Sequence, residues 1–271
     1  MKGAMLDAPQ PLPPDEVQLW FAFPAELHDP ALLARYAALM NDEERARHDR
    51  FVFARHRHEF LVARALVRGT LSRYLPGVPP ARWIFSHNEH GRPELAGPVE
   101  TDLRFNLSHT GGLILLGVVR GRDIGVDVED TERRVSFMEI ADRFFSPAEM
   151  RDLHALDPAG QRARFFHYWT LKEAYIKARG KGLAIPLHHF SYAVRTGEPL
   201  RIAIDPAQAD EPASWHFALL RPTPRHTAAL AVRLPERARR PDRVQILRTT
   251  PLSSHQRLDV ELLASSEQPL G

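Results

Sequence analysis

The sequence predicts an α+β protein of two similar lobes, each a small antiparallel sheet packed with helices. Three observations lead to this fold class. Both halves of the chain run from strand-like residues through helical segments to short strands, the apolar spacing changes between a period of two and one of three to four residues, and 271 residues correspond to one or two domains. We expect a loose arm over 1–16, an N-terminal lobe over 17–120, a C-terminal lobe over 121–234 and a mobile tail over 235–271. A cleft between two such lobes is a common place for an active site.

The first half contains strand, helix and hairpin signals in turn. Residues 17–23 (VQLWFAF) are typical of a strand, and apolar residues at helical spacing over 30–75 predict two or three helices, the longest from about 55 to 74. Residues 81–95 indicate a strand, a polar turn and a short strand. Two apolar segments, 103–119 and 122–130, are separated by Arg120-Gly121, so we predict that they pair as a hairpin.

The second half begins with helices and ends with strands. Over 137–156 the pattern is helical, and Ser146-Pro147 is typical of a helix start with proline at the first helical position. Residues 162–182 (RARFFHYWTLKEAYIKARGKG) form the strongest predicted helix, with Gly180 and Gly182 as capping signals. Strands are predicted at 190–194, 201–204, 215–220 and 228–232; apolar periodicity fades from residue 235.

Composition excludes several classes of chemistry. The chain has no cysteine, so a disulfide, a thiolate nucleophile and a cysteine-ligated metal are excluded. The net charge of +2 is too small for a general polyanion-binding field, so we expect no nucleic-acid partner. No apolar run is long enough to span a membrane and the N-terminus does not resemble a signal peptide, so we expect a cytoplasmic protein without a membrane partner.

Two carboxylates share one face of a predicted strand. In IGVDVE (124–129) the period of two places Asp127 and Glu129 on the same side, with their stems about 6.6 Å apart. Like charges this close disfavour each other unless a cation lies between them, and an all-oxygen ligand set favours Mg²⁺ or Mn²⁺ over Zn²⁺. The alternative is an ordinary half-exposed strand with its polar face in water.

An acid and two bases lie close together on the strongest predicted helix. Three of the four lysines of the chain fall within ten residues there. Glu173 and Lys177 are four residues apart on one face, and Lys172 is about 100° away around the axis. The neighbouring aromatic residues favour a largely buried helix, where charges need partners. The alternative is a surface ion pair worth about 0.3–0.5 kcal/mol.

FNLSHT (105–110) offers polar groups on a strand and its turn. Ser108 and His109 are adjacent, so they point to opposite faces and do not form a nucleophile–base pair. Asn106, Ser108 and His109 are instead candidates to hold phosphate oxygens, or simply polar residues that cap a turn.

The segments FNLSH, GVDVE, FFSPAE and WTLKEAYIKARGKGL, in this order, resemble the Sfp-type 4′-phosphopantetheinyl transferases. The resemblance spans roughly residues 17–232, with weaker matches at DEERARHDRF (42–51) and GRPEL (91–95). It implies a monomeric pseudo-dimer of two α+β lobes, with coenzyme A and magnesium in the cleft between them.

The resemblance also implies roles for individual residues. Asp127, Glu129 and Glu173 would ligate Mg²⁺, with Mn²⁺ as a possible substitute, and Glu173 would also be a candidate base. Lys172 and Lys177 would face the pyrophosphate of coenzyme A. Glu44 stands where a further base is common in the family. The 3′-phosphate and adenosine end would be held by Arg47, Arg92, Asn106, Ser108 and His109.

The implied activity is that of a holo-[acyl-carrier-protein] synthase type phosphopantetheinyl transferase. Such an enzyme transfers 4′-phosphopantetheine from coenzyme A to a serine of an apo acyl or peptidyl carrier protein and releases 3′,5′-ADP, as fatty-acid, polyketide or nonribosomal-peptide biosynthesis requires. Two alternatives remain from the residues alone. One is a metal-dependent phosphodiesterase or nuclease, since paired acids with a lysine also describe such sites. The other is a catalytically silent scaffold that binds coenzyme A or a carrier protein.

Overall fold

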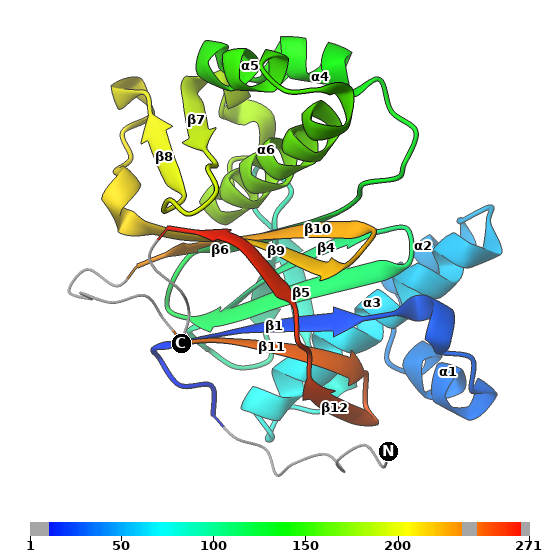
Figure 1. Cartoon of the computed structure of the whole chain (residues 1–271). Coiled ribbons are helices and arrows are strands. Elements are labelled where there is room, and N and C mark those ends of the chain that lie inside the picture. Colours follow the sequence, from blue (N-terminus) through cyan, green and yellow to red (C-terminus); the bar gives the residue numbers. More distant parts are fainter. Residues whose placement is uncertain (1–10, 235–242, 267–271) are drawn as a thin grey trace. The chain divides into compact units, whose positions relative to one another are not determined.

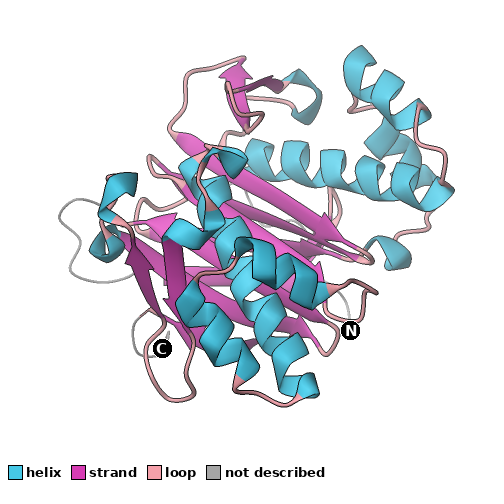
Figure 2. Cartoon of the chain, turned by 90° about the horizontal axis from the view of Figure 1, so that it is seen from above, coloured by secondary structure: helices cyan, strands magenta, loops and turns pink. Residues whose placement is uncertain are grey.

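The computed structural model describes residues 11–234 and 243–266, and Figure 1 shows the course of the chain. Contacts within the chain divide it into two units. Among the described residues, unit 1 holds 11–87, 93–121 and 244–258, and unit 2 holds 88–92, 122–243 without the undescribed 235–242, and 259–266. Both units contain helices and strands, which Figure 2 colours cyan and magenta, so the α+β prediction is confirmed.

Unit 1 is built on a five-stranded sheet in the order β12-β11-β1-β5-β4. Its three helices appear where the apolar spacing predicted them, and a short two-stranded sheet, β2-β3, lies at 84–97. Buried residues of the sheet and of α3 form one hydrophobic core, which includes Trp20, Leu66 and Ile114. The elements are β1 (Glu16–Ala22), α1 (Pro30–Ala37), α2 (Asp42–Asp49), α3 (Ala54–Tyr74), β2 (Ile84–His87), β3 (Pro93–Gly97), β4 (Leu103–Thr110), β5 (Leu113–Arg120), β11 (Arg243–Thr250) and β12 (Ser254–Arg257).

Unit 2 is built on a four-stranded sheet in the order β13-β9-β10-β6, with a long helix, α6, packed along β6 and β10. The close packing depends on Gly125: a Cβ atom there would lie 2.0 Å from the Ala174 carbonyl oxygen and 2.4 Å from the Ala178 nitrogen, both backbone atoms of α6. The elements are β6 (Ile124–Asp130), α4 (Phe137–Phe144), α5 (Pro147–His154), α6 (Pro158–Arg179), β7 (Phe190–Ala193), β8 (Arg201–Ile204), β9 (Trp215–Thr223), β10 (His226–Arg233) and β13 (Glu261–Ser265).

Local capping signals predicted the start of α5 and the end of α6 correctly, whereas α6 begins at Pro158, four residues before the predicted 162. Ser146 caps α5 and forms a capping box with Glu149, with Pro147 at the first helical position. Helix α6 begins after Asp157, whose side chain accepts from the Gly160 nitrogen. It ends at Gly180, whose φ of 63° is the left-handed conformation that favours glycine. Among the described residues, no helix is both long and apolar enough to cross a bilayer.

The predicted hairpin between 103–119 and 122–130 is wrong. Residues 103–120 themselves form a hairpin, β4 and β5, around a turn at Gly111-Gly112. β5 then pairs with β1 on its other side, so its hydrogen-bonding edges are both occupied. β6 pairs instead with β10, about a hundred residues further along the chain. The turn at Arg120-Gly121 therefore connects β5 and β6, which belong to two different sheets.

The predicted mobile tail is wrong for the described residues 243–265, which form β11, β12 and β13. β11 joins β1 in the sheet of unit 1, and β13 joins β9 in the sheet of unit 2. Most side chains of β11 are only half-buried, which explains why apolar alternation is weak there. Residues 235–242 and 267–271 lie outside the described part of the chain. Residues 1–10 of the predicted arm also lie outside it, whereas Leu12 is buried.

Candidate active site

Asp127 and Glu129 lie on β6, an edge strand of the sheet of unit 2. β10 fixes the strand from one side, with Asp127 opposite Ala229 and Glu129 opposite Thr227. Because side chains alternate along a strand, both acids share the face of Gly125, against which α6 packs. Gly125, which has no side chain, therefore allows α6 to lie close against the strand that carries both acids.

Lys177 of α6 binds Asp127 directly. The ammonium Nζ lies 2.6 Å from Asp127 Oδ1, and the carboxylate is buried while the side chain of Lys177 is 28% exposed. A charge-assisted hydrogen bond at this depth is stronger than a surface ion pair. The contact joins the strand motif GVDVE to the helix motif WTLKEAYIK.

Glu129 and Glu173 lie close enough to Asp127 for its negative charge to affect the pKa of both carboxyl groups. Burial, and then the negative charge of Asp127, raise the pKa of Glu129 to about 7. The same two causes, in the same order, raise the pKa of Glu173, while Lys177 opposes them. Three carboxylates therefore share one neighbourhood with a single lysine, and Glu173 does not face bulk water as an ordinary surface residue would.

The acids are not assembled as a metal-ligand cluster. Glu129 accepts a hydrogen bond from Trp169 Nε1 at 3.0 Å and pairs with the Arg133 guanidinium at 3.3 Å, while Lys177 binds Asp127. Within the described residues, no group of three His, Asp or Glu side chains is arranged to hold a metal ion. Trp169 and Arg133 were not predicted as site residues, although Trp169 belongs to the WTLKEAYIK motif.

Lys172 does not belong to this centre, and its predicted role at the pyrophosphate is wrong. The side chain is completely buried, and its Nζ donates to the carbonyl oxygens of Leu187 and Phe190, both at 2.7 Å. It also pairs with Glu149 at 2.9 Å and lies 4.4 Å from the centre of the Phe190 ring. The rotation of about 100° between consecutive helix positions sends Lys172 into the core while its neighbour Glu173 meets Asp127.

Glu149 is a further residue that sequence reasoning missed. It is completely buried, and its two oxygens accept from the backbone nitrogens of Ser146 and Tyr192, each at 2.9 Å, besides pairing with Lys172. A buried carboxylate requires such partners. The signal was present in FFSPAE, where Glu149 occupies the third helical position of a capping box, but the sequence did not indicate its link to Lys172.

Arg92, predicted at the 3′-phosphate, lies in unit 2 against the end of α6. Its guanidinium donates to the Ala178 carbonyl oxygen at 2.9 Å, lies 3.7 Å from Asp123, and occupies the space where a Cβ of Gly180 would be. A cation is favourable at this end because helix carbonyls are unpaired there. Arg92 thus has a structural role, and its role at a phosphate stays a prediction.

The other predicted coenzyme A ligands lie in unit 1. Arg47 is exposed on α2, with its guanidinium 5.5 Å from the centre of the Phe60 ring. On β4, Asn106 and Ser108 are buried and His109 is exposed. This alternation agrees with the expectation that adjacent strand residues take opposite faces; their ligand roles stay predictions.

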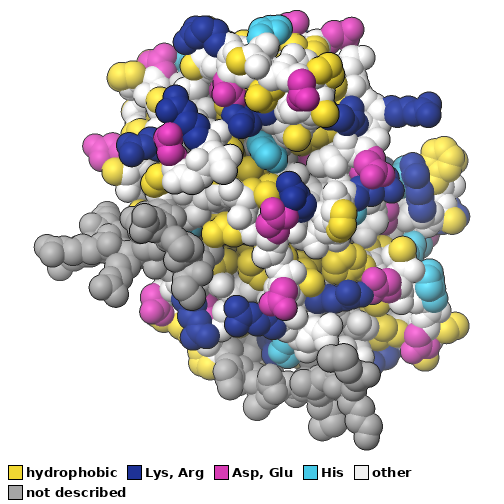
Figure 3. Space-filling model, viewed as in Figure 1, with side chains coloured by type: hydrophobic (Ala, Val, Ile, Leu, Met, Phe, Trp, Pro, Cys, Tyr) yellow, Lys and Arg dark blue, Asp and Glu magenta, His cyan; other side chains and the backbone are white. Residues whose placement is uncertain are grey.

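Glu44 has structural contacts within unit 1 that account for an acid at this position. Its Oε2 accepts from the fully buried guanidinium of Arg68 at 2.7 Å, and its side chain also closes a capping box with Asn41. The acid that departs from the family pattern therefore neutralises a buried arginine. Elsewhere on the surface, Figure 3 shows basic and acidic side chains interspersed over the face in view.

An acid–lysine centre of this kind on an α+β scaffold is typical of enzymes that act on phosphorylated substrates, because the carboxylates suit a hard cation and the lysine suits phosphate oxygens. Two family models match the chain. The 4′-phosphopantetheinyl transferase superfamily matches residues 123–232, and the N-terminal 4′-phosphopantetheinyl transferase model matches residues 29–119. The chain belongs to the 4′-phosphopantetheinyl transferase superfamily.

Individual relatives agree with this assignment. The chain is 36% identical over 219 residues to the 4′-phosphopantetheinyl transferase HetI of Nostoc sp., covering 80% of this chain and 88% of that protein. It is 35% identical over 178 residues to the 4′-phosphopantetheinyl transferase Sfp of Bacillus subtilis, covering 66% of this chain and 76% of that protein. These relatives make the subtype Sfp-like rather than the holo-[acyl-carrier-protein] synthase type that we predicted.

Among solved structures, the chain is similar to the holo-[acyl-carrier-protein] synthase AcpS of Thermotoga maritima, with 21% identity and a TM-score of 0.34 over 42% of this chain and 64% of that chain.

Proposed function

We propose that the protein transfers the 4′-phosphopantetheine group from coenzyme A to a serine of an apo acyl or peptidyl carrier protein. The single observation that carries this proposal is the contact between Lys177 and Asp127, with Glu129 and Glu173 beside them. It brings the motifs GVDVE and WTLKEAYIK together at one centre. In the proposed reaction the serine Oγ–phosphorus bond forms, the bond from phosphorus to the bridging oxygen of coenzyme A breaks, and 3′,5′-ADP leaves.

The oxygen donors of this centre suit a divalent cation such as Mg²⁺ or Mn²⁺ by their chemistry, although among the described residues the carboxylates are not arranged as a ligand cluster. Asp127, Glu129 and Glu173 offer only carboxylate oxygens, the ligands these ions prefer, and the mutual repulsion that raises the pKa of both glutamates is what a bound cation would relieve. When bound, the ion would offset negative charge on the pyrophosphate. The site residues that would hold it are the three carboxylates, with Lys177 released from Asp127.

Lys177 and Glu173 have separate roles in the proposed reaction. The partly exposed ammonium of Lys177 stabilises the negative charge that develops on the leaving oxygen. Glu173 lies on the same face of α6, one helical turn away, and accepts the proton of the attacking serine. Trp169 and Arg133 keep Glu129 directed into the centre by their contacts with its carboxylate.

The test is a transfer assay with the purified chain, an apo carrier protein, coenzyme A and Mg²⁺, followed by mass spectrometry of the carrier. We expect a mass increase of one phosphopantetheine group, lost on addition of a chelator. Glu173→Gln and Lys177→Ala should reduce transfer by about a hundredfold or more. Lys181→Ala, an exposed lysine just beyond α6, is the matched control and should transfer normally. Coenzyme A binding without any mass increase would contradict the proposal and favour a silent scaffold.

A further inference from the structure

The short connection between α2 and α3 in unit 1 exposes two large apolar side chains that are neighbours in the sequence (Figure 1). Val52 is 83% exposed and Phe53 is 62% exposed, the two highest values among the large hydrophobic residues that the structure describes. We name residues 50–57 the α2–α3 tip. Apolar residues scattered singly over a surface need no explanation, whereas two adjacent ones indicate a contact surface.

Contacts within unit 1 fix the backbone of this tip. The guanidinium of Arg57 donates to the Phe51 carbonyl oxygen at 2.6 Å. The backbone nitrogen of His56 donates to the Phe53 carbonyl oxygen at 3.0 Å. The Phe51 ring packs against Phe60 of α3, with 5.5 Å between the ring centres. Phe51 is therefore half-buried, and the two residues after it are held in solvent by an ordered turn.

Positive charge accompanies the exposed apolar pair. The α2–α3 tip, RFVFARHR, contains three arginines and no acid. Arg50 and Arg55 lie on either side of the pair in the sequence, and both are exposed. Among the described residues, neither forms an ion pair. The acid just before the tip, Asp49, contacts His48 at 2.8 Å. The tip therefore suits a partner that is negatively charged and offers an apolar layer.

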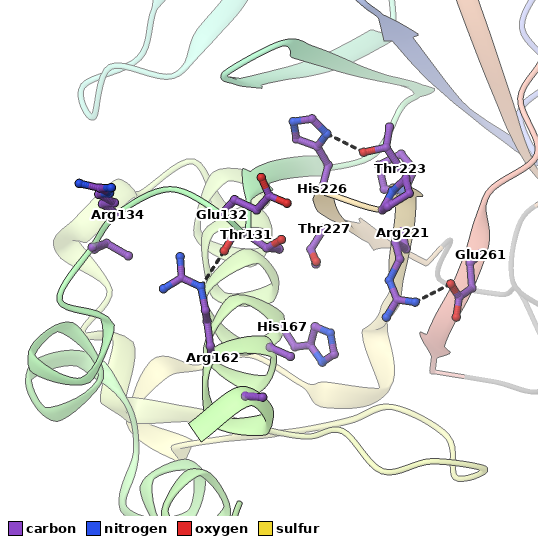
Figure 4. A pocket seen from close by; sticks show the side chains of 15 residues that line it. Thr131, Glu132, Arg134, Arg162, His167, Arg221, Thr223, His226, Thr227 and Glu261 are labelled. Carbon is purple, nitrogen blue, oxygen red and sulfur yellow. Dashed lines mark hydrogen bonds and ion pairs between the residues drawn. The ribbon is translucent and has the colours of Figure 1, made fainter. Parts of the chain in front are cut away.

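The size of the exposed pair favours a lipid surface over a protein. A large side chain buries about 150–250 Å², so two of them cover much less than the about 800 Å² that each partner contributes to a stable protein–protein interface. The tip also lines neither of two cavities, of about 1100 and 350 Å³, whose residues all belong to unit 2; Figure 4 shows the larger one. A membrane interface requires no cavity in the protein, because the protein inserts into the lipid.

We propose that the α2–α3 tip binds the surface of a bilayer that contains anionic lipids. Val52 and Phe53 enter the boundary between headgroups and acyl chains, and Arg50 and Arg55 bind the lipid phosphate groups. Since each contribution is small, stable binding needs both the apolar pair and the arginines. We expected no membrane partner because the sequence has no spanning segment, but reversible binding at a surface requires none. None of these four residues belongs to the acid centre, so transfer in solution does not depend on them.

The test is co-sedimentation of the full chain with sucrose-loaded vesicles. One set consists of phosphatidylcholine, and the other of phosphatidylcholine and phosphatidylglycerol in a ratio of about two to one. We expect binding to the anionic vesicles only. This binding should be lost as the salt concentration is raised from about 0.1 M to 1 M, because the screening length falls from about 10 Å to 3 Å.

Substitutions at the tip separate the two contributions. The double variant Val52→Ser/Phe53→Ser should lower the partition coefficient for anionic vesicles at least tenfold. Serine is a favoured residue just before a helix, so α3 is retained in this variant. Arg50→Gln and Arg55→Gln should each lower the partition coefficient about fivefold. The matched control is Ile84→Ser/Val99→Ser, which removes two exposed apolar side chains elsewhere in unit 1 and should bind as the wild type does.

Equal binding of the wild type and of Val52→Ser/Phe53→Ser to the anionic vesicles would overturn the inference, and so would equal binding of the wild type to both kinds of vesicle or to neither. Two other occupants of the tip give distinct results that also overturn it. A higher KM for the carrier protein in the double variant, with vesicle binding unchanged, would make the tip a carrier-docking surface. A dimer in sedimentation velocity that only this variant abolishes would make it a contact between two copies of the chain.

Discussion

Replacing Lys172 by methionine tests whether this lysine of the WTLKEAYIK motif serves the core or the substrate. Methionine has a similar length and no charge. In the structure, Lys172 and Glu149 are both completely buried and pair at 2.9 Å, and two carbonyl oxygens also depend on the ammonium group. Removal of one partner of a buried ion pair costs about 3–5 kcal/mol, because the remaining charge is left without compensation.

The assay is urea unfolding of the wild type, Lys172→Met, Glu149→Gln and the double variant. We expect each single substitution to lower the free energy of unfolding by about 3–5 kcal/mol. The double variant should lose less than the sum of the two, with a coupling energy of about 2 kcal/mol or more, because neither buried charge is then left alone. Well below its unfolding temperature, Lys172→Met should retain the KM for coenzyme A of the wild type within about twofold.

The opposite pattern would refute this reasoning. If Lys172 faced the pyrophosphate, the methionine variant would keep its stability and its KM for coenzyme A would rise strongly. Lys177→Ala provides the comparison, since it removes the lysine that does contact the acid centre.

Three further predictions follow from packing and charge. Gly125→Ala should lower the free energy of unfolding by more than about 3 kcal/mol, because its Cβ would overlap the backbone of α6, whereas Gly77→Ala, with open space around it, should stay within about 0.5 kcal/mol. Burial lowers the pKa of His167 in the folded protein to about 4, so the unfolded chain binds a proton there at a higher pH than the folded protein does. The free energy of unfolding is therefore highest above pH 6.5 and falls as the pH drops towards 4. In urea unfolding, the free energy of unfolding of the wild type should fall by about 2 kcal/mol relative to that of His167→Phe between pH 7.5 and pH 5. A pH-independent difference between the two would contradict the assignment. Glu44→Gln should lower the free energy of unfolding by about 3 kcal/mol, since Arg68 stays buried; a normal denaturation midpoint would show that Arg68 finds other partners.

Helices and their ends were predictable because their signals are local. Ser146 and Gly180 act within a few residues of themselves, so the sequence alone contains the cause and its effect; the cap at Asp157 is equally local but was not used in placing the start of α6. The acid centre was predictable for the same reason in part. Strand alternation puts Asp127 and Glu129 on one face, and helical spacing puts Glu173 and Lys177 on another, although only the fold brings the two faces together.

What could not be predicted depends on partners far away in the chain. β6 looked like a hairpin partner for β5 because the strand that completes it, β10, begins at residue 226. The family resemblance assigned Lys172 to the pyrophosphate, and nothing near it in the sequence indicates that its ion-pair partner is Glu149, on a different helix. β11 and β13 have weak apolar patterns of their own. Each is a strand because it pairs with a strand far away in the sequence, β11 with β1 and β13 with β9.

The position of β11 and β13 also has a consequence for biosynthesis. A ribosome delivers the chain in order, and β1, β4 and β5 emerge long before residues 243–250, which lie between β1 and β12 in the finished sheet. Likewise β9 acquires its outer neighbour only with residues 261–265. During translation both sheets thus keep an unpaired edge, and such edges can pair wrongly with other chains. Completion of either sheet therefore awaits the same late stretch of polypeptide, residues 243–265.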